Sequence, residues 1–159
     1  MIRKAVFYDY DKISEIYSRA REFMKSAGNP DQWGDGYPPK ERIEKDLKRG
    51  ALYLLTEGED VRAVFYFAKE RDESYKDIDT DLFGNEEYGV IHRVATAVQG
   101  KGTVKEIFAY CESICPRLMI DTHKDNIPMQ RALGKAGFTA CGTVYTELGG
   151  ERTAFYKGK

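Results

Sequence analysis

The sequence predicts one mixed α/β domain, residues 1–159, built on a β-sheet with helices on both faces. The length of 159 residues fits a single domain that is large enough to bury a core. Short apolar runs rich in β-branched residues alternate with stretches in which apolar residues recur every three or four positions. The resulting order is a strand, two helices, two antiparallel strands, then strand, helix, strand, helix and a final pair of strands. This alternation predicts a mixed sheet covered on both sides.

Composition excludes several classes of protein. The net charge is −1, with 42% hydrophobic and 32% charged residues, so charge gives no reason to expect nucleic acid or an anionic membrane as a partner. No apolar run is long enough to span a bilayer, and the first residues read as a strand rather than a signal peptide. Three cysteines, an odd number, argue against a disulfide framework. We therefore expect a cytoplasmic protein.

The first third of the chain predicts a strand, a helix, a loop and a second helix. A short strand covers about residues 2–7, and the first helix ends at Gly28. Its predicted apolar face consists of Ile13, Ile16, Tyr17, Ala20, Phe23 and Met24. The loop at 31–37 carries the only tryptophan, Trp33, which either plugs the edge of the core or forms a wall of a ligand pocket. The second helix starts near Pro38 and ends at Gly50.

The next segments predict a hairpin and a long polar connection. Residues 51–56 and 61–68 read as strands joined by the turn at 57–60. Residues 69–87 are polar and acidic, with a few embedded apolar side chains, and a loop of this length is either functional or mobile. The acidic side chains of this segment would suit a cationic ligand such as an amine, but a solvated surface explains them as well.

The central stretch combines a strand at 90–98, a loop at 99–103 and a helix at 104–115. Gly100 and Gly102 let the loop turn tightly, and the helix leaves its first N–H groups unpaired at the positive end of its dipole. Lys101 adds a cation. A strand, a glycine loop and a helix N-terminus together can hold a phosphate, although the same glycines can serve the turn alone. The two common nucleotide-binding fingerprints are absent.

The C-terminal third predicts a buried strand, a helix and a hairpin. The strand covers residues 117–122, and Asn126 caps a helix that ends near Gly137. Residues 138–145 and 152–156 form the final hairpin, with its turn at Leu148–Glu151. An edge strand in this position can pair across a homodimer.

Two motifs in this order resemble a known family. Gln99-x-x-Gly102 before an amphipathic helix resembles motif A of the GNAT acetyltransferases, and Asn126 to Phe138 resembles the later Asn…Gly-Phe helix of that family. His92-Arg93, the stretches 28–37 and 121–126, and Cys141-Gly142 resemble a bacterial subgroup of it. The resemblance implies a mostly antiparallel sheet with a splayed central strand pair. It also implies acetyl-CoA as cosubstrate and transfer of an acetyl group to the amine of a small molecule or peptide.

The resemblance also assigns cosubstrate-binding positions. Backbone N–H groups near Val94, Ala95 and Thr96 would polarise the thioester. Motif A begins at Gln99, and the backbone from Gly100 through Lys101, Gly102 and Thr103 to Val104 would hold the pyrophosphate. Asn126 would meet the pantetheine or adenosine part of acetyl-CoA.

This sequence departs from the family pattern at two positions. Val104 stands where the family has a small residue, and its side chain narrows the space beside the pyrophosphate. Leu133 stands where many members have the tyrosine that protonates the leaving thiolate. These two residues favour an alternative function, a CoA-binding regulatory or sensor domain with little or no transferase activity.

His92 and His123 are the only histidines, and both are general-base candidates because a neutral imidazole accepts a proton near pH 7. Either can instead be a hydrogen-bonded scaffold residue. Asp121, His123 and Asp125 match a metal site only loosely, so we expect no metal. Arg93 would pair with an acceptor carboxylate or with Asp121, or form a purely structural ion pair. The acceptor-pocket candidates are Trp33, Tyr37, Arg93, Asp121 and Tyr145.

Overall fold

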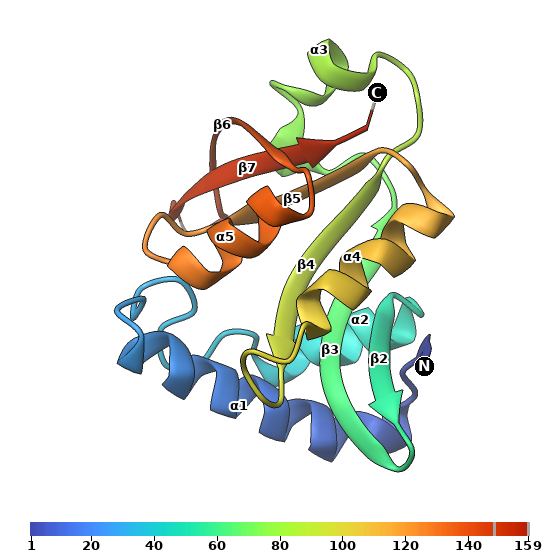
Figure 1. Cartoon of the computed structure of the whole chain (residues 1–159), viewed down its shortest axis with the longest axis vertical. Helices are drawn as coiled ribbons and strands as arrows, with labels where there is room; N and C mark the ends of the chain where they lie inside the picture. The colour runs from blue at the N-terminus through green and yellow to red at the C-terminus, as the bar shows by residue number, and fades with distance from the viewer. Residues whose placement is uncertain (148, 159) are drawn as a thin grey trace.

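The computed structural model describes residues 1–147 and 149–158. Within them the strands form a seven-stranded sheet in the order β1-β2-β3-β4-β5-β7-β6 (Figure 1). The strands are β1 (Ile2–Lys4), β2 (Leu52–Glu57), β3 (Asp60–Lys69), β4 (Gly89–Thr96), β5 (Leu118–Thr122), β6 (Thr139–Tyr145) and β7 (Glu151–Lys157). All neighbours are antiparallel except β4 and β5, which are parallel. The predicted mixed, mostly antiparallel sheet is confirmed.

Helices cover both faces of the sheet, as predicted. They are α1 (Tyr10–Ser26), α2 (Lys40–Lys48), α4 (Thr103–Ile114) and α5 (Ile127–Lys135), with the short η1 (Phe7–Asp9), η2 (Glu73–Tyr75) and α3 (Asp79–Phe83). One core cluster joins α1 and α2 to the sheet, and a second joins α4 and α5 to the opposite face. No helix in the described part of the chain combines the length and apolar character needed to cross a membrane.

The central strand pair is splayed. β4 and β5 pair only over Gly89–Ile91 and Leu118–Ile120, and beyond these residues they have no mutual register. Figure 1 shows the two strands diverging from a common end. The remainder of β4 therefore presents a free backbone edge toward β5, and this opening is where the functional candidates gather.

Three local predictions differ from the structure. The segment at 69–87 is not one loop, because Tyr75 and Phe83 are buried in the α1–α2 core and fold the chain into η2 and α3. The first strand ends at Lys4, before the turn of η1, and the central strand ends at Thr96. The predicted hairpin turn includes Leu148, which lies outside the described residues.

Candidate active site

A bulge in β4 sets the geometry of the site. Between Ala95 and His92 the strand has one residue more than its partner β3, and Arg93 takes the left-handed conformation with φ of 51°. Such a conformation is rare for a residue other than glycine and must be held by its surroundings. The hydroxyl of Tyr17, buried on α1, donates to the carbonyl oxygen of Arg93 at 2.9 Å. Helix α1 therefore stabilises the bulge.

The bulge places consecutive side chains on one face of the sheet. Val90 packs in the α1–α2 core and Ile91 in the α4–α5 core, as strand alternation requires. At the bulge the alternation breaks, and His92 and Arg93 both contact residues on the α1–α2 face. Beyond the bulge, β4 no longer pairs with β5, and its residues Val94, Ala95 and Thr96 are buried.

The N-terminus of α4 follows the C-terminal end of β4 after a short loop. Gly100 and Gly102 have φ of 76° and 71°, a conformation that favours glycine, and a Cβ at either position would meet no described atom within 4 Å. Glu106 N donates to Gly102 O, so the N–H groups before it have no helical acceptor. Gly102 offers no side chain to cap them. They remain available to an anion.

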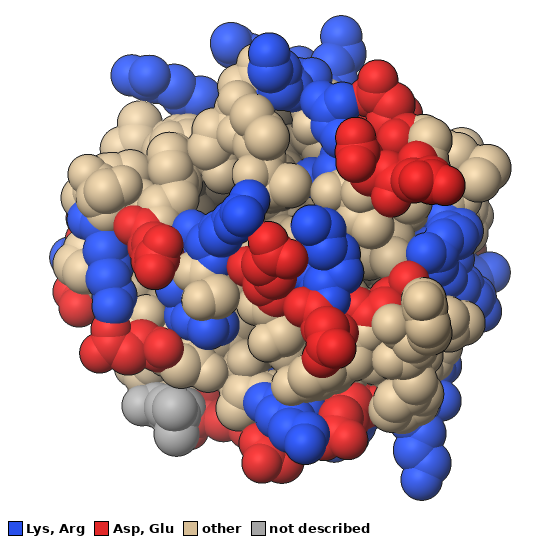
Figure 2. All heavy atoms as spheres, turned by 90° about the horizontal axis from the view of Figure 1, so that it is seen from below, with Lys and Arg blue, Asp and Glu red and all other residues tan. Residues whose placement is uncertain are grey.

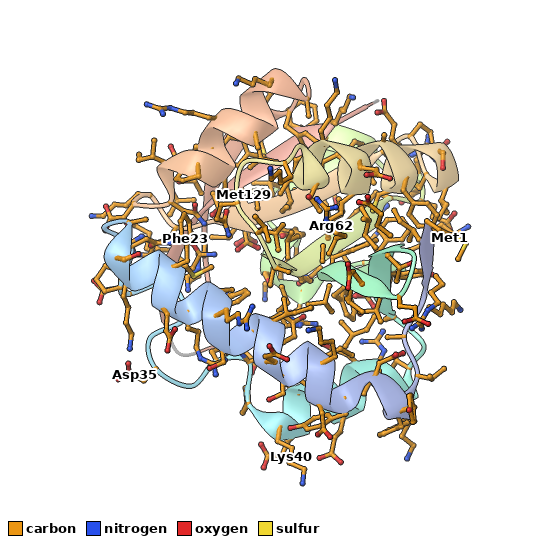
Figure 3. All side chains as sticks on the ribbon, turned by 60° about the horizontal axis from the view of Figure 1, so that its bottom comes forward. Met1, Phe23, Asp35, Lys40, Arg62 and Met129 are labelled. Atoms are coloured by element: carbon orange, nitrogen blue, oxygen red, sulfur yellow. The ribbon has the colours of Figure 1, made fainter. Side chains whose placement is uncertain are left out.

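A cleft of about 630 Å³ connects these features. It is lined by the C-terminal part of α1, the end of β4, the loop that opens α4, and α5. Its walls include Val94, Ala95, Thr96, Gln99, Gly100, Lys101, Gly102, Thr103, Val104 and Asn126. Phe23 on α1 and Met129 on α5 lie on opposite walls (Figure 3). All ten predicted cosubstrate residues thus line one cleft.

The charge of this cleft is one-sided. Four exposed cations, Lys101, Lys105, Arg131 and Lys135, line it, and no Asp or Glu is among its lining residues. In Figure 2, Lys and Arg side chains lie at the upper left and upper centre of the molecule, and Asp and Glu side chains lie at the upper right. We call these four residues the basic rim. Together with the N-terminus of α4, the rim makes this end of the cleft suited to phosphate groups.

His92 belongs to a polar network on the α1–α2 face. Its Nε2 lies 2.7 Å from Oδ2 of Asp72, and its ring contacts the rings of Tyr66 and Tyr75. Tyr75 donates from its hydroxyl to Oδ2 of Asp121 at 2.6 Å. Burial opposes ionisation of Asp72, but the hydrogen bond and charge of His92 lower its pKa well below the ordinary value. Tyr75 therefore bridges the two diverging strands, and His92 has a carboxylate partner.

Arg93 pairs with residues of α2 and of the loop before it. Its Nε donates to Oδ2 of Asp46 on α2 at 2.8 Å, its guanidinium lies over the ring of Tyr66, and it reaches the hydroxyl of Tyr37 at 3.3 Å. Asp46 is 1% exposed, and burial raises its pKa although the charge of Arg93 opposes the shift. Of the interpretations left open for Arg93, the structural ion pair is the one observed, and its partner is Asp46 rather than Asp121.

The remaining predicted residues lie in different surroundings. His123 is buried, and its Nδ1 accepts a hydrogen bond from the backbone N–H of Asp125 at 3.0 Å. Trp33 packs edge-on against Tyr17 at the border of the core, and Tyr145 is 61% exposed. Neither histidine lines the cleft. Among the described residues no three His, Cys, Asp or Glu side chains gather as metal ligands.

Sequence reasoning missed several residues of this region. Phe23 and Met24 continue the apolar periodicity of α1, but at its C-terminal end they face the cleft instead of the core. Asp72 and Tyr75 lie in the segment that the sequence predicted to be an acidic loop. Their contacts with His92 and Asp121 are seen only in the structure, in which Tyr75 is buried. Asn29 directly follows the helix stop at Gly28, but its burial could not be read from the sequence.

The fold and the cleft together define a class of protein. The protein has a mixed α/β fold whose sheet opens between two parallel strands. A glycine loop, a helix N-terminus and the basic rim lie beside this opening. No protein-family model matches the sequence, and no curated protein matches it. Solved structures do match.

The chain is similar over its whole length to a GNAT-family acetyltransferase of Streptococcus agalactiae, with 28% identity, a TM-score of 0.88 and 95% of that chain covered. A protein of Staphylococcus aureus matches 99% of the chain and 98% of its own at 27% identity and a TM-score of 0.74. A Salmonella typhimurium protein, solved with its cofactor acetyl-CoA, shares the fold at 19% identity and a TM-score of 0.65, covering 98% of this chain and 91% of its own. The chain shares the fold of the GNAT-family acetyltransferases over its whole length.

Proposed function

We propose that this protein is an N-acetyltransferase that moves an acetyl group from acetyl-CoA to the amine of a small molecule or peptide. The observation that carries the proposal is the single cleft of about 630 Å³, which runs from the basic rim and the α4 N-terminus to the opening between β4 and β5. A phosphate-binding end joined to an apolar channel matches the two halves of acetyl-CoA. The relatives named above support the same assignment.

In this proposal each part of the cleft holds a part of acetyl-CoA. The backbone from Gly100 to Val104 and the basic rim bind the phosphates. Gln99 donates to Thr96 Oγ1 at 3.0 Å, which fixes the start of the loop. The pantetheine arm lies along the free edge of β4, where N–H groups near Val94, Ala95 and Thr96 polarise the thioester carbonyl. Asn126 lines the same arm.

The transfer step needs a deprotonated amine. The amine nitrogen forms a bond to the thioester carbonyl carbon, the carbon–sulfur bond breaks, and CoA leaves as a thiolate that takes up a proton. We propose His92 as general base, directly or through water, because Asp72 accepts from Nε2–H and leaves Nδ1 able to accept a proton. His123 is the second candidate, although its Nδ1 is engaged by Asp125. Trp33, Tyr37, Asp121 and Tyr145 are the proposed acceptor contacts, with Arg93 positioning Tyr37.

One observation favours a second function. Leu133 is fully buried in the α4–α5 core, so its position cannot supply the proton that the departing thiolate takes. A CoA-binding regulatory or sensor domain that does not transfer remains the alternative. CoA release with any amine acceptor would exclude it.

Two wider proposals complete the assignment. The first is a cytoplasmic location, because free thiols such as the buried Cys111 and Cys115 are typical of a reducing compartment.

The second is a homodimer. β6 is an edge strand of the described sheet, and pairing with a second copy would cover its outer backbone groups. Sedimentation analysis distinguishes such a homodimer from a monomer.

The deciding experiment is calorimetric titration with acetyl-CoA of the wild type and of Gly102→Glu. The variant places a negative side chain at the phosphate end, so we expect wild-type binding to be lost. Gly58→Glu is the matched control, because Gly58 has φ of 61°, has no described atom near its Cβ position and lies in the remote β2–β3 turn. A wild type that releases no heat with acetyl-CoA would overturn the proposal, whereas binding justifies an acceptor screen read out by thiol release.

A further inference from the structure

One buried acceptor in the cleft has no donor. Asn29 directly follows the C-terminal turn of α1, lines the cleft and is 3% exposed. Its Oδ1 is buried and has no hydrogen-bond partner within the described residues. A buried carbonyl oxygen without a donor costs free energy, so such groups are normally paired in the functional state.

The orientation of this amide is set from helix α5. Asn126 caps α5, because its Oδ1 accepts from the backbone N–H of Met129 at 3.2 Å. The cap fixes which end of the Asn126 amide is oxygen. The Nδ2 group must then point the other way, and it donates to Oε1 of Gln32 at 3.0 Å.

Gln32 transmits this orientation to Asn29. Its Oε1 also lies 3.4 Å from the hydroxyl of Thr122 and from the backbone N–H of His123, both donors at the end of β5. Because these donors converge on it, this atom is the oxygen of the Gln32 amide. Asn29 therefore turns its Nδ2 to Gln32, at 2.9 Å, and keeps its Oδ1 for another partner. Rotating the Asn29 amide would bring two oxygens together.

The missing partner is a hydrogen-bond donor that occupies the cleft, and a ligand N–H group would serve. In the proposed function the phosphates lie at the basic rim, and the pantetheine arm continues past the apolar wall formed by Ala20, Phe23 and Ala27 of the α1 segment. That arm carries two amide N–H groups between apolar methylenes, which matches a mostly apolar wall with one buried acceptor. The adenine amino group is the other N–H donor of acetyl-CoA.

We propose that Asn29 is a cosubstrate-binding residue whose Oδ1 accepts a hydrogen bond from a pantetheine amide N–H, and that Gln32 is the positioning residue that holds it. The inference rests on the proposed function. It adds a contact from the α1–α2 connection to the contacts that the β4 edge and the α4 N-terminus provide. It also links the α5 cap to cosubstrate recognition.

The test compares two ligands by calorimetry. CoA contains the pantetheine arm, and adenosine 3′-phosphate 5′-diphosphate carries the same adenine and phosphates without it. For Asn29→Ala we expect the Kd for CoA to rise about fivefold to tenfold, as loss of one buried hydrogen bond implies, with the Kd for the fragment unchanged. Circular dichroism of each variant verifies folding.

Gln32 provides a matched pair of variants. Gln32→Glu keeps an oxygen for every donor that converges on Oε1, so CoA affinity should stay within about twofold. Gln32→Met removes that oxygen and frees the Asn29 amide to rotate, so it should weaken CoA binding about as much as Asn29→Ala does.

The outcomes separate the inference from the function. Wild-type protein that binds neither ligand overturns the proposed function and the inference with it. Wild-type binding of CoA that Asn29→Ala leaves unchanged overturns the inference alone, because water would then satisfy Oδ1. Equal weakening of CoA and the fragment also overturns it, since the contact would lie outside the pantetheine arm.

Discussion

Two side-chain pairs, each with an aspartate, lie next to each other on the α1–α2 face because of the backbone conformation of one residue. The left-handed Arg93 breaks the alternation of β4, so that His92 reaches Asp72 while Arg93 reaches Asp46. The pairs differ in exposure, with side chains 19% and 16% exposed in the first and 10% and 1% in the second. The pair of Arg93 and Asp46 is the more buried of the two and is suited to hold the bulge in place.

Asp72→Asn should reduce catalysis if His92 is the general base. The change removes the negative charge that stabilises the protonated imidazole, and it allows the amide nitrogen to face Nε2 and change the tautomer. We expect kcat/KM at neutral pH to fall about tenfold to a hundredfold. Asp81→Asn, at an exposed position of α3, is the control. An unchanged kcat/KM in Asp72→Asn would assign the base elsewhere.

The same residue predicts an effect of pH on stability. The pKa of Asp72 is lowered in the folded protein, so its contribution is fully present above the ordinary pKa of an aspartate, about 4, and is lost as pH falls through the folded value. The difference in the free energy of unfolding between wild type and Asp72→Asn should therefore shrink below about pH 4. Urea denaturation at a series of pH values measures it. A difference that grows in acid would contradict this assignment.

Asp46→Ala should be among the most destabilising single changes in the chain. It leaves the guanidinium of Arg93 buried without its carboxylate, a situation that costs about 3–5 kcal/mol. Asp46→Asn keeps an acceptor for Nε and should cost less. Urea denaturation of both variants provides the comparison, and equal stability of Asp46→Ala and wild type would show that the pair contributes nothing.

At the level of residues, the cap predicted at Asn126 from its place before a helix is confirmed. The roles of the only two histidines stay predictions. Asp72 could not be found, because its relation to His92 is created by the fold of a segment 20 residues earlier in the chain. The partner of Arg93 was missed for the same reason, since α2 lies in another part of the sequence.

At the scale of elements, long amphipathic helices were predictable and local irregularities were not. Periodicity identified α1 and α4, start and stop residues identified α2 and α5, and β-branched runs identified the long strands. The bulge has no sequence signature, because glycine or asparagine would be expected at a left-handed residue and the chain has Arg93 instead. η2 and α3 escaped prediction because a few buried side chains, not a repeating pattern, hold them.

The elements that frame the phosphate end predict a salt-dependent affinity. Lys101 and Lys105 come from the loop and first turn of α4, while Arg131 and Lys135 come from α5. CoA binding by the wild type should weaken as salt increases, because these cations are exposed and screened. Lys101→Gln with Arg131→Gln should lower the affinity and flatten the salt dependence. Lys40→Gln is the control on α2, away from the cleft (Figure 3). A salt response unaffected by the double change would place the phosphates elsewhere.

For the whole molecule, the opening between β4 and β5 removes strand pairing from the middle of the sheet, and it also provides space in which a ligand can bind. β4 and β5 share only three paired positions, yet the α1–α2 core contains residues from both sides, such as Val90 and Met119. The arrangement of layers was predictable from the order of elements, whereas the opening followed only from the family resemblance. The bulge at Arg93 lies just beyond the last paired position of β4, Ile91, and Tyr17 of α1 holds it.

Acetyl-CoA should raise the melting temperature of the whole protein in a single transition. The proposed site contacts α1 and β4 on one side of the opening and α5 on the other, so the ligand binds only when both sides are folded. At a hundredfold excess over Kd, binding adds about 2.7 kcal/mol to the free energy of unfolding, which corresponds to about 5–10 °C for a chain of this size. Differential scanning calorimetry with and without ligand measures the shift, and Gly102→Glu should show none. Two separated transitions, or a shift confined to one of them, would contradict folding of residues 1–159 as one domain.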